Sequence, residues 1–318
     1  NYNIKLISYL SEKNQLIKLY KKFGINDFQS FSFKFLKDYN FFFYALLIFP
    51  IYFFKILLYD KNWFINNFKI KKIYVGDLIY DSFIRYNLRF KDSYKLSLHF
   101  YSIIFLTILN ISKLNKLFSE NDFKCVISQT HVYASLSSLA IRIALNKRIK
   151  VLMPIGGRLV IYKNIDDCMI SEVAIKKNKL NNLLNKNWQK ELDIYLSYRR
   201  AGKIKGTTAK DAYQKKNDFS KNDRFNSMIK DKKKFSKIGL LATHCLSDAN
   251  HAGGNFFFND FYTHFVETLN IIKNDLKTLW IIKPHPTSMY YNEEDFIHKE
   301  IIKRKLKNVI ICPNDVKP

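Results

Sequence analysis

The chain has 318 residues, a net charge of +26 and a hydrophobic content of 47%. The length is enough for two domains that each bury a core, and the hydrophobic content excludes a disordered chain. The charge could attract nucleic acid, anionic lipid or phosphorylated substrates, although lysines that accumulate on solvated helix faces would give the same value. Because lysines outnumber arginines and no arginine-rich tract occurs, no nucleic-acid partner is expected.

The four cysteines indicate a reducing compartment. They are Cys125, Cys168, Cys245 and Cys312, and none forms a CxxC pair or stands at zinc-binding spacing from two histidines. Cys125 and Cys312 fall in apolar runs, so we expect both thiols to be buried. The pattern predicts a cytoplasmic protein.

The longest apolar stretch covers residues 41–59 and leaves three interpretations open. It could form a buried or interfacial pair of helices, because Pro50 interrupts it. It could lie in the plane of a membrane, which the basic surroundings favour. It could also span a membrane, although Lys55 would then sit inside the apolar region. We expect an anionic membrane surface as a partner.

The first part of the chain alternates strand and helix patterns. A short strand or turn at residues 70–75 leads through Gly76 into a helix that Asp77 could cap. A helix is predicted at residues 99–117. A buried strand at 123–128, a helix at 132–145 and a strand at 148–154 form a predicted βαβ unit, which favours a parallel sheet.

The same alternation of strand and helix patterns returns in the second part of the chain. A helix at 171–201 and a lysine-rich linker at 215–235 precede it. Strands are predicted at 237–243, 278–282 and 308–312, with helices at 261–274 and 293–306. We therefore predict an α/β protein in which two Rossmann-like domains face a cleft. Their bounds are 1–214 and 236–318, and the second domain is expected to be incomplete at its end.

The motif Lys283-Pro284-His285-Pro286 directly follows a predicted strand. Parallel α/β sheets bind ligands at the carboxyl ends of their strands. Each proline restricts its own backbone and that of the residue before it, so Lys283 and His285 are presented rigidly. A rigid cationic pair at a strand end suits the phosphate of an activated donor. We assign Lys283 and His285 to donor binding.

The loop at residues 243–254 (THCLSDANHAGG) follows another predicted strand. It has neither a Walker nor a GxGxxG pattern. His244 and His251 are expected to bind a sugar or phosphate of the donor together with Gly254, and Asp248 to orient a histidine as part of the catalytic machinery. The alternative, a metal bound by two histidines and an aspartate, lacks a third strong ligand. The chain also has no DxD motif, and adjacent acids such as those at 293–295 are more often solvated, so neither a metal nor another cofactor is expected.

Residues of the first domain could face the same cleft. His131 follows the strand at 123–128 and could act as a base toward an acceptor hydroxyl. Asp81 and Arg85 have the spacing of a surface ion pair on a helix. Asp77, Asp81 and Arg85 could instead line an acceptor groove, and we include Asp81 among the candidate catalytic residues.

These motifs together resemble a known family. The segments VGDLIYDS, SQTHVY, HCLSDANHAGG, FNDFYTHFVETL and WIIKPHP are similar to those of bacterial capsule and lipopolysaccharide glycosyltransferases. Such enzymes have the GT-B architecture of two Rossmann-like domains. The resemblance covers the chain from about residue 70 onward, and the combination of KPHP with the two upstream segments is more specific than KPHP alone.

The resemblance implies metal-independent transfer of a sugar from a nucleotide-activated donor to a growing surface polysaccharide or a lipid-linked acceptor. It implies that His285 and Pro286 lie near the donor phosphate. Similar His-Pro elements occur in transferases of CMP-linked acidic sugars and in polymerases that use CDP-glycerol, so a glycerophosphotransferase is one alternative. A non-catalytic basic module that binds anionic membrane or nucleic acid is another. In the family a later Gly/Thr/Ser-rich loop followed by Glu completes the donor pocket, and the chain ends at Pro318 before such a loop, so a fragment is expected.

Overall fold

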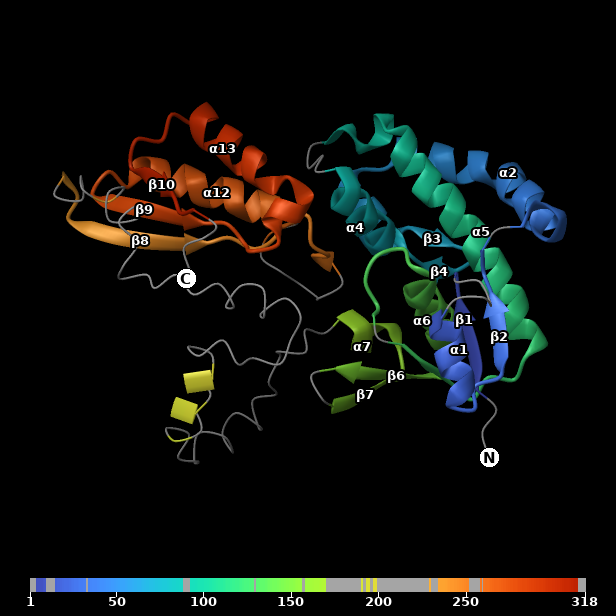
Figure 1. Ribbon diagram of the computed structural model, residues 1–318. Coiled ribbons are helices and arrows are strands. Elements are labelled where there is room, and N and C mark those ends of the chain that lie inside the picture. Colours follow the sequence, from blue (N-terminus) through green and yellow to red (C-terminus); the bar gives the residue numbers. More distant parts are fainter. Residues whose placement is uncertain are drawn as a thin grey trace. The chain divides into compact units, whose positions relative to one another are not determined.

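The computed structural model shows a mixed α/β protein with two compact units (Figure 1). Unit 1 contains Asn1–Ile79 and Tyr94–Ile165, and unit 2 contains Tyr80–Ser93 and Asp166–Pro318. The predicted helix at 171–201 and linker at 215–235 lie almost wholly outside the described residues. The described residues are 4–9, 15–32, 34–87, 92–128, 130–155, 158–169, 190, 193–194, 197–198, 229, 234–251, 258 and 260–313.

The βαβ unit predicted in unit 1 is confirmed. Strand β5 (Cys125–Ile127) and strand β6 (Lys150–Ile155) are parallel and are connected through helix α6 (Leu136–Asn146). Strand β7 (Arg158–Tyr162), which the sequence did not reveal, pairs with β6 in the antiparallel direction. The burial predicted for β5 is wrong, because Cys125 and Ile127 are exposed and Val126 is only partly buried.

Helix α6 begins later than its apolar pattern predicted, because Ser135 caps it. The Ser135 Oγ accepts a hydrogen bond from the Ser138 backbone N–H over 3.2 Å. A cap of this kind satisfies a backbone donor that the first helical turn leaves without a partner. The preceding residues 130–134 therefore form a connection rather than a first helical turn.

Two long helices pack side by side in unit 1 (Figure 1). Helix α2 (Phe35–Leu58) continues through Pro50 as one helix, so the pair of helices predicted for this stretch is wrong. Helix α5 (Leu98–Glu120) confirms the prediction for residues 99–117. Aromatic contacts join the two helices, including Phe42 with Phe105 and Phe49 with Tyr101.

Gly76 lets the chain turn from a hairpin into a helix in unit 1. Helix α3 (Lys61–Asn67) precedes the hairpin of β3 (Lys69–Ile70) and β4 (Ile73–Tyr74). Helix α4 (Gly76–Asn87) then begins against the carbonyl of Phe64, which a Cβ atom on Gly76 would approach to 2.0 Å. Because this contact is impossible for a larger residue, the close approach requires glycine.

Unit 1 also contains smaller elements. Strands β1 (Lys5–Ser8) and β2 (Asp27–Ser30) are parallel, with helix α1 (Gln15–Lys22) between them in sequence. The other short helices are η1 (Asp92–Leu96), which crosses the unit boundary, and α7 (Ile165–Met169), which begins at it.

Unit 2 is built around a parallel sheet with the strand order β10-β9-β8. Its elements follow the predicted order and lie within a few residues of the predicted bounds, because each apolar run is short and ends at polar residues. They are β8 (Lys237–Ala242), α12 (Phe261–Asn274), β9 (Thr278–Lys283), η5 (Ser288–Tyr291), α13 (Glu293–Lys303) and β10 (Val309–Ile311).

Candidate functional site at the strand ends of unit 2

The register of two parallel strands brings the two main histidines of unit 2 together. Ala242 at the end of β8 pairs with Lys283 at the end of β9. His244 and His285 each stand two residues further along, so they leave the sheet at the same level. Their ring centroids are 5.6 Å apart with an interplanar angle of 25°. The two histidines therefore lie next to each other at the carboxyl ends of adjacent parallel strands.

A third ring extends this stack. Phe261, the first residue of α12, lies over His244 with a centroid distance of 4.0 Å and an interplanar angle of 13°. His244 is thus held between Phe261 and His285. Stacking on two sides restricts the rotation of the imidazole and fixes the direction of its edge. The three rings come from the loop after β8, the start of α12 and the turn after β9, so the stack forms only when unit 2 is folded.

The hydrogen bonds of His285 determine its tautomer. Its Nδ1 accepts from the backbone N–H of Thr287 at 3.2 Å and lies 2.8 Å from the Thr287 hydroxyl oxygen. A nitrogen that accepts an N–H bond carries no proton, so the neutral ring carries its proton on Nε2. His285 therefore presents an N–H donor at its outer edge.

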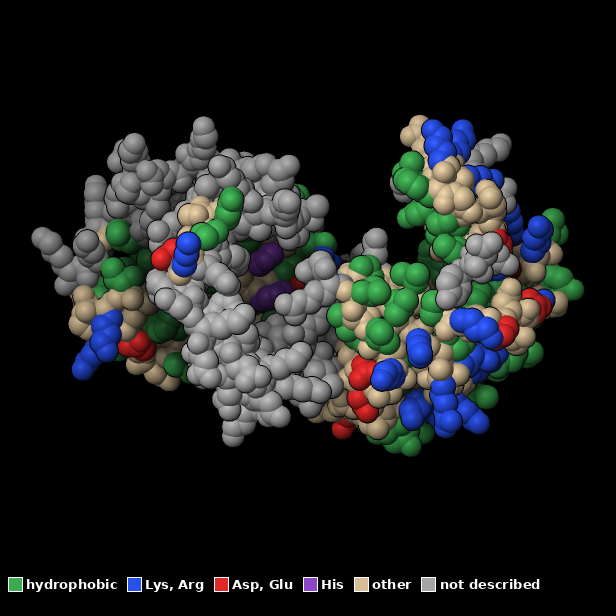
Figure 2. Space-filling model, turned by 90° about the horizontal axis from the view of Figure 1, so that it is seen from below, with side chains coloured by type: hydrophobic (Ala, Val, Ile, Leu, Met, Phe, Trp, Pro, Cys, Tyr) green, Lys and Arg blue, Asp and Glu red, His purple; other side chains and the backbone are tan. Residues whose placement is uncertain are grey.

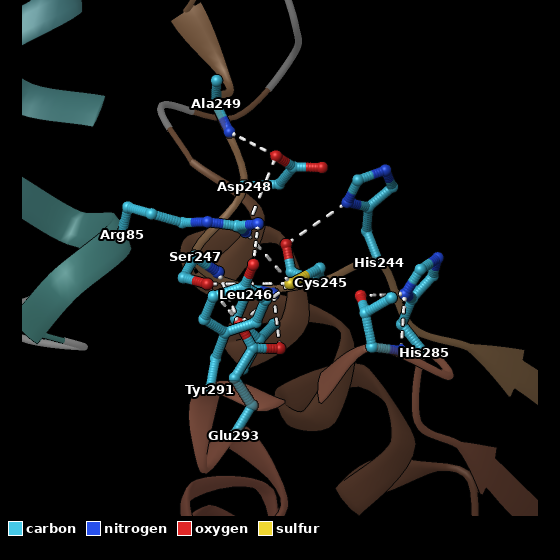
Figure 3. Close-up of polar contacts among 11 residues, drawn as sticks. Arg85, His244, Cys245, Leu246, Ser247, Asp248, Ala249, His285, Tyr291 and Glu293 are labelled. Atoms are coloured by element: carbon cyan, nitrogen blue, oxygen red, sulfur yellow. Dashed lines mark hydrogen bonds and ion pairs between the residues drawn. The ribbon is translucent and has the colours of Figure 1, made fainter. Parts of the chain in front are cut away.

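His244 has the opposite tautomer. Its Nδ1 lies 3.2 Å from the backbone oxygen of Cys245. A carbonyl oxygen only accepts, so Nδ1 carries a proton, and in the neutral ring the lone pair then lies on Nε2. The stacked histidines thus offer one N–H donor and one nitrogen acceptor on neighbouring rings (Figure 3).

The surroundings favour the neutral form of His285. Burial lowers its pKa below the usual value of 6.5, and the nearby His244 lowers it further, while the carboxylates of Asp248 and Glu293 oppose the shift. A neutral histidine at physiological pH can donate from Nε2 without a full positive charge. Such a group can stabilise negative charge that develops on a ligand oxygen.

A buried glutamate holds the loop that carries His244. Glu293, the first residue of α13, has a fully buried side chain. Its carboxylate accepts from the backbone N–H groups of Leu246 at 3.0 Å and Ser247 at 2.9 Å, and from the Ser247 hydroxyl at 2.6 Å (Figure 3). A carboxylate at the N-terminus of a helix is also favoured by the helix dipole.

Cys245 belongs to this hydrogen-bond network. Its thiol donates to Oε1 of Glu293 over 3.1 Å. Burial raises the pKa of the thiol to about 11, and the negative charge of Glu293 contributes to the increase. The thiolate, which is the reactive form, is therefore scarce at neutral pH. Cys312 is also buried, as predicted.

Arg85 of α4 contacts this loop. Its guanidinium lies over the ring of Tyr291, 3.7 Å from the centroid, and donates to the Tyr291 hydroxyl. One of its nitrogens is 3.8 Å from Oδ1 of Asp248, which also accepts from the Ala249 N–H (Figure 3). Arg85 was predicted to line an acceptor groove, and the structure places it beside Asp248 in unit 2.

Asp81 of α4 forms a pair with His251. Oδ1 of Asp81 is 2.6 Å from Nδ1 of His251, and its Oδ2 accepts from the His251 backbone N–H over 3.2 Å. Asp81 is completely buried, so its interpretation as part of a surface pair is wrong. Burial raises the pKa of Asp81, and the hydrogen bonds from His251 lower it part of the way. Because the carboxylate holds the proton of His251 on Nδ1, the lone pair of the neutral ring lies on Nε2.

The remaining donor-side predictions have different outcomes. Lys283 is largely buried, and its ammonium donates to the backbone oxygen of Pro313 over 2.7 Å. Pro286 lies in the turn that follows β9. Gly254 lies outside the described residues.

Two predicted residues belong to unit 1. The ring of His131 meets the ring of Tyr162 edge-on at 6.0 Å. Asp77 lies in the first turn of α4, one residue after its start, rather than at the cap position. Its carboxylate accepts from Arg142 over 2.5 Å, with both side chains 1% exposed. The roles predicted for these residues in acceptor binding stay predictions.

Sequence reasoning missed several residues of the site. Glu293 was grouped with solvated acids, although it is buried. Phe261, Thr287 and Tyr291 were not recognised, and only the position of Phe261 after a polar loop could have indicated its stacking role. Among the residues that the structure describes, no group of three His, Cys, Asp or Glu side chains could hold a metal ion.

Comparisons with known proteins do not assign the chain to a family. No family model matches the chain, and no curated protein or solved structure matches it either.

Proposed function

We propose that the protein is a glycosyltransferase that moves a sugar from a nucleotide-activated donor to a saccharide or lipid-linked acceptor, as expected from the sequence motifs. In this proposal the two units correspond to two Rossmann-like domains, and the protein is cytoplasmic and peripheral at the inner face of the inner membrane. The observation that carries it is the stacked pair of His244 and His285 at the carboxyl ends of parallel strands, with opposite tautomers. Such strand ends are where open α/β sheets bind nucleotides.

The reaction requires stabilisation of the leaving phosphate. The acceptor oxygen forms a bond to the anomeric carbon of the sugar, and the bond from that carbon to the phosphate oxygen breaks with its electron pair. Negative charge then grows on the nucleotide phosphate. The Nε2–H of His285 is a donor suited to that charge, and Nε2 of His244 is an acceptor suited to a hydroxyl of the donor. Lys283 contributes positive charge at the same edge of the sheet.

The acceptor hydroxyl must also lose its proton to a base. His251 is one candidate, because Asp81 holds its Nδ1 proton and stabilises the imidazolium that forms when Nε2 accepts a proton. Asp81 is then a positioning residue. His131 of unit 1 is the other candidate base. Asp248, paired with Arg85, would keep the loop around the donor in place.

The alternatives predict different partners. A transferase that uses CDP-glycerol would employ the same strand-end histidines, so the identity of the bound nucleotide decides between the two. A basic binding module would need its lysines gathered on one surface. On the face shown in Figure 2, the Lys and Arg side chains of unit 1 are interleaved with hydrophobic and acidic side chains, which favours a general compositional bias over a nucleic-acid surface.

A calorimetric screen of CMP-, CDP- and UDP-linked donors tests the proposal. We expect one nucleotide class to bind. His285→Ala is expected to weaken that binding by about tenfold or more, because the variant loses one charge-assisted hydrogen bond. His298→Ala is the matched control, because His298 is an exposed histidine on α13. Failure of all donors to bind a folded protein, or equal losses in the two variants, would refute the proposal.

A further inference from the structure

The outer face of helix α2 carries an apolar stripe. Six side chains at spacings of three, four or seven residues line it, which places them on one side of a helix. Leu36 is 89% exposed and Leu58 is 79% exposed at its two ends. Large exposed apolar patches mark interaction surfaces in soluble proteins. The stripe consists of Leu36, Phe43, Leu47, Ile51, Phe54 and Leu58.

The opposite face of α2 is occupied by the protein itself. Phe42, Phe49 and Phe53 contact aromatic rings of α5. Asp38, the single acid in the sequence of the helix, forms an ion pair with Lys113 of α5 at 2.8 Å. The helix is long and apolar enough to cross a membrane by length and composition. A span would place this face in lipid and break the ion pair, whereas a helix lying in the interface buries only its outer face.

Lysines stand beside the stripe. Lys37 and Lys55 are exposed on α2. At the tip of the β3–β4 hairpin, the Lys71 ammonium lies 3.9 Å from the centroid of the Tyr44 ring of α2, and the Lys71 N–H donates to the Tyr52 hydroxyl at 3.2 Å. An apolar helix face flanked by lysines suits an anionic membrane surface. The apolar side chains would enter the acyl region, and the lysines would contact the charged headgroups.

The hairpin tip itself has a conformation that lysine disfavours. Lys71 and Lys72 are its two central residues, with φ angles of 48° and 68°. Two-residue turns with positive φ at both positions strongly favour Asn-Gly. The turn therefore keeps two lysines at a conformational cost of roughly 1 kcal/mol or more each, and the first of them, Lys71, contacts α2.

From these observations we propose that the α2 stripe docks unit 1 onto an anionic lipid bilayer, with α2 lying in the plane of the interface and Lys71 and Lys72 contacting lipid phosphates. This docking does not depend on the proposed sugar transfer. It gives the general expectation of a peripheral protein a specific surface and a specific orientation of one helix.

Vesicle flotation of the full chain tests the proposal. The probes are vesicles of phosphatidylcholine alone and of phosphatidylcholine mixed with phosphatidylglycerol. Leu47→Asp combined with Phe54→Asp is expected to reduce binding to both vesicles by at least about tenfold, because two apolar side chains no longer enter the acyl region. The matched control is Leu276→Asp with Ile302→Asp, two exposed residues of unit 2, and it is expected to bind as the wild type does.

Lys71→Asn combined with Lys72→Gly tests the headgroup contact separately. Binding to the anionic vesicles is expected to fall roughly fivefold per lysine, while binding to the neutral vesicles stays unchanged. The same variant is expected to unfold at a higher temperature, because Asn-Gly fits the turn, so a loss of binding cannot result from unfolding. Lys124→Asn with Lys147→Asn removes the same charge from exposed positions elsewhere in unit 1 and serves as the control.

Three results would overturn the proposal. Binding that is insensitive to either test variant would show that the stripe and the hairpin are not the contact. A dimer in solution that dissociates in the Leu47→Asp, Phe54→Asp variant, without vesicle binding by the wild type, would assign the stripe to a second copy of the chain. Retention in membranes after alkaline carbonate extraction would show that α2 spans the bilayer.

Discussion

Oδ1 of Asp81 lies 2.6 Å from Nδ1 of His251, although the two residues are 170 positions apart in the chain. A buried carboxylate on a histidine is an arrangement that fixes the imidazole tautomer and stabilises its protonated form. Both contacts of Asp81 with His251 lie within unit 2.

The first prediction concerns this pair. Asp81→Asn is expected to reduce transfer from the donor identified by the binding screen by about 100-fold or more, the range of a general base. The acidic limb of the pH–rate profile is expected to shift, whereas donor affinity is retained. Asp295→Asn, at an exposed position of α13, is the control. An unchanged profile with a reduced rate would mean that Asp81 serves the fold alone.

The second prediction concerns the stability of unit 2. Glu293→Ala removes the acceptor of two backbone N–H groups, a hydroxyl and a thiol. We expect the free energy of unfolding to fall by about 3 kcal/mol or more, because buried donors are left without partners. Urea denaturation gives this value, and amide hydrogen exchange at Leu246 and Ser247 should accelerate. Glu294→Ala, one residue further along α13, should have little effect.

The third prediction is a pH dependence from His285. The pKa of this histidine is lower in the folded protein than in the unfolded chain. The unfolded chain therefore takes up a proton first as the pH decreases, so the contribution of His285 to stability is complete above about pH 6.5 and is lost as the pH falls through the lower, folded pKa. Unfolding measured from pH 7.5 to 5 should show a steeper loss for the wild type than for His285→Gln. Parallel curves would contradict this assignment.

The fourth prediction separates structure from function at Asp77. Asp77→Asn leaves the charge of Arg142 buried, and we expect it to cost about 3–5 kcal/mol of unfolding free energy. Asp77→Leu combined with Arg142→Met should recover most of the loss, since an apolar pair of similar volume can replace a buried ion pair. A double-mutant cycle with both single variants measures the coupling. Should the double variant be stable but fail to bind acceptor, Asp77 would have the acceptor role that the sequence suggested.

The sheet of unit 2 could be predicted from the sequence, because its strands are short apolar runs with clear ends and its neighbours follow chain order. The proximity of His244 and His285 follows from that order, since both come directly after adjacent parallel strands. The pairing of Asp81 with His251 could not be predicted. It depends on how α4 packs against a loop far away in sequence, and no local pattern encodes that contact.

Glu293 and α2 show two other limits of sequence reasoning. Three successive acids usually indicate a solvated surface, yet Glu293 is buried because the folded loop turns its N–H groups toward it. Pro50 predicted a break, since proline in a helix costs about 3 kcal/mol. The helix continues instead, and its packing against α5 on both sides of Pro50, through Phe49 and Phe53, supplies contacts that local propensity does not include.

The stack of Phe261 on His244 has a spectroscopic consequence. At 4.0 Å and 13° from parallel, the phenyl ring current shields the carbon-bound protons of the imidazole and moves their magnetic resonance signals upfield. Any molecule that enters between the rings, or that pulls the histidine away, changes this shielding directly. The imidazole proton signals of His244 therefore report on ligand binding without an added label. They can be followed in a titration before any product is known.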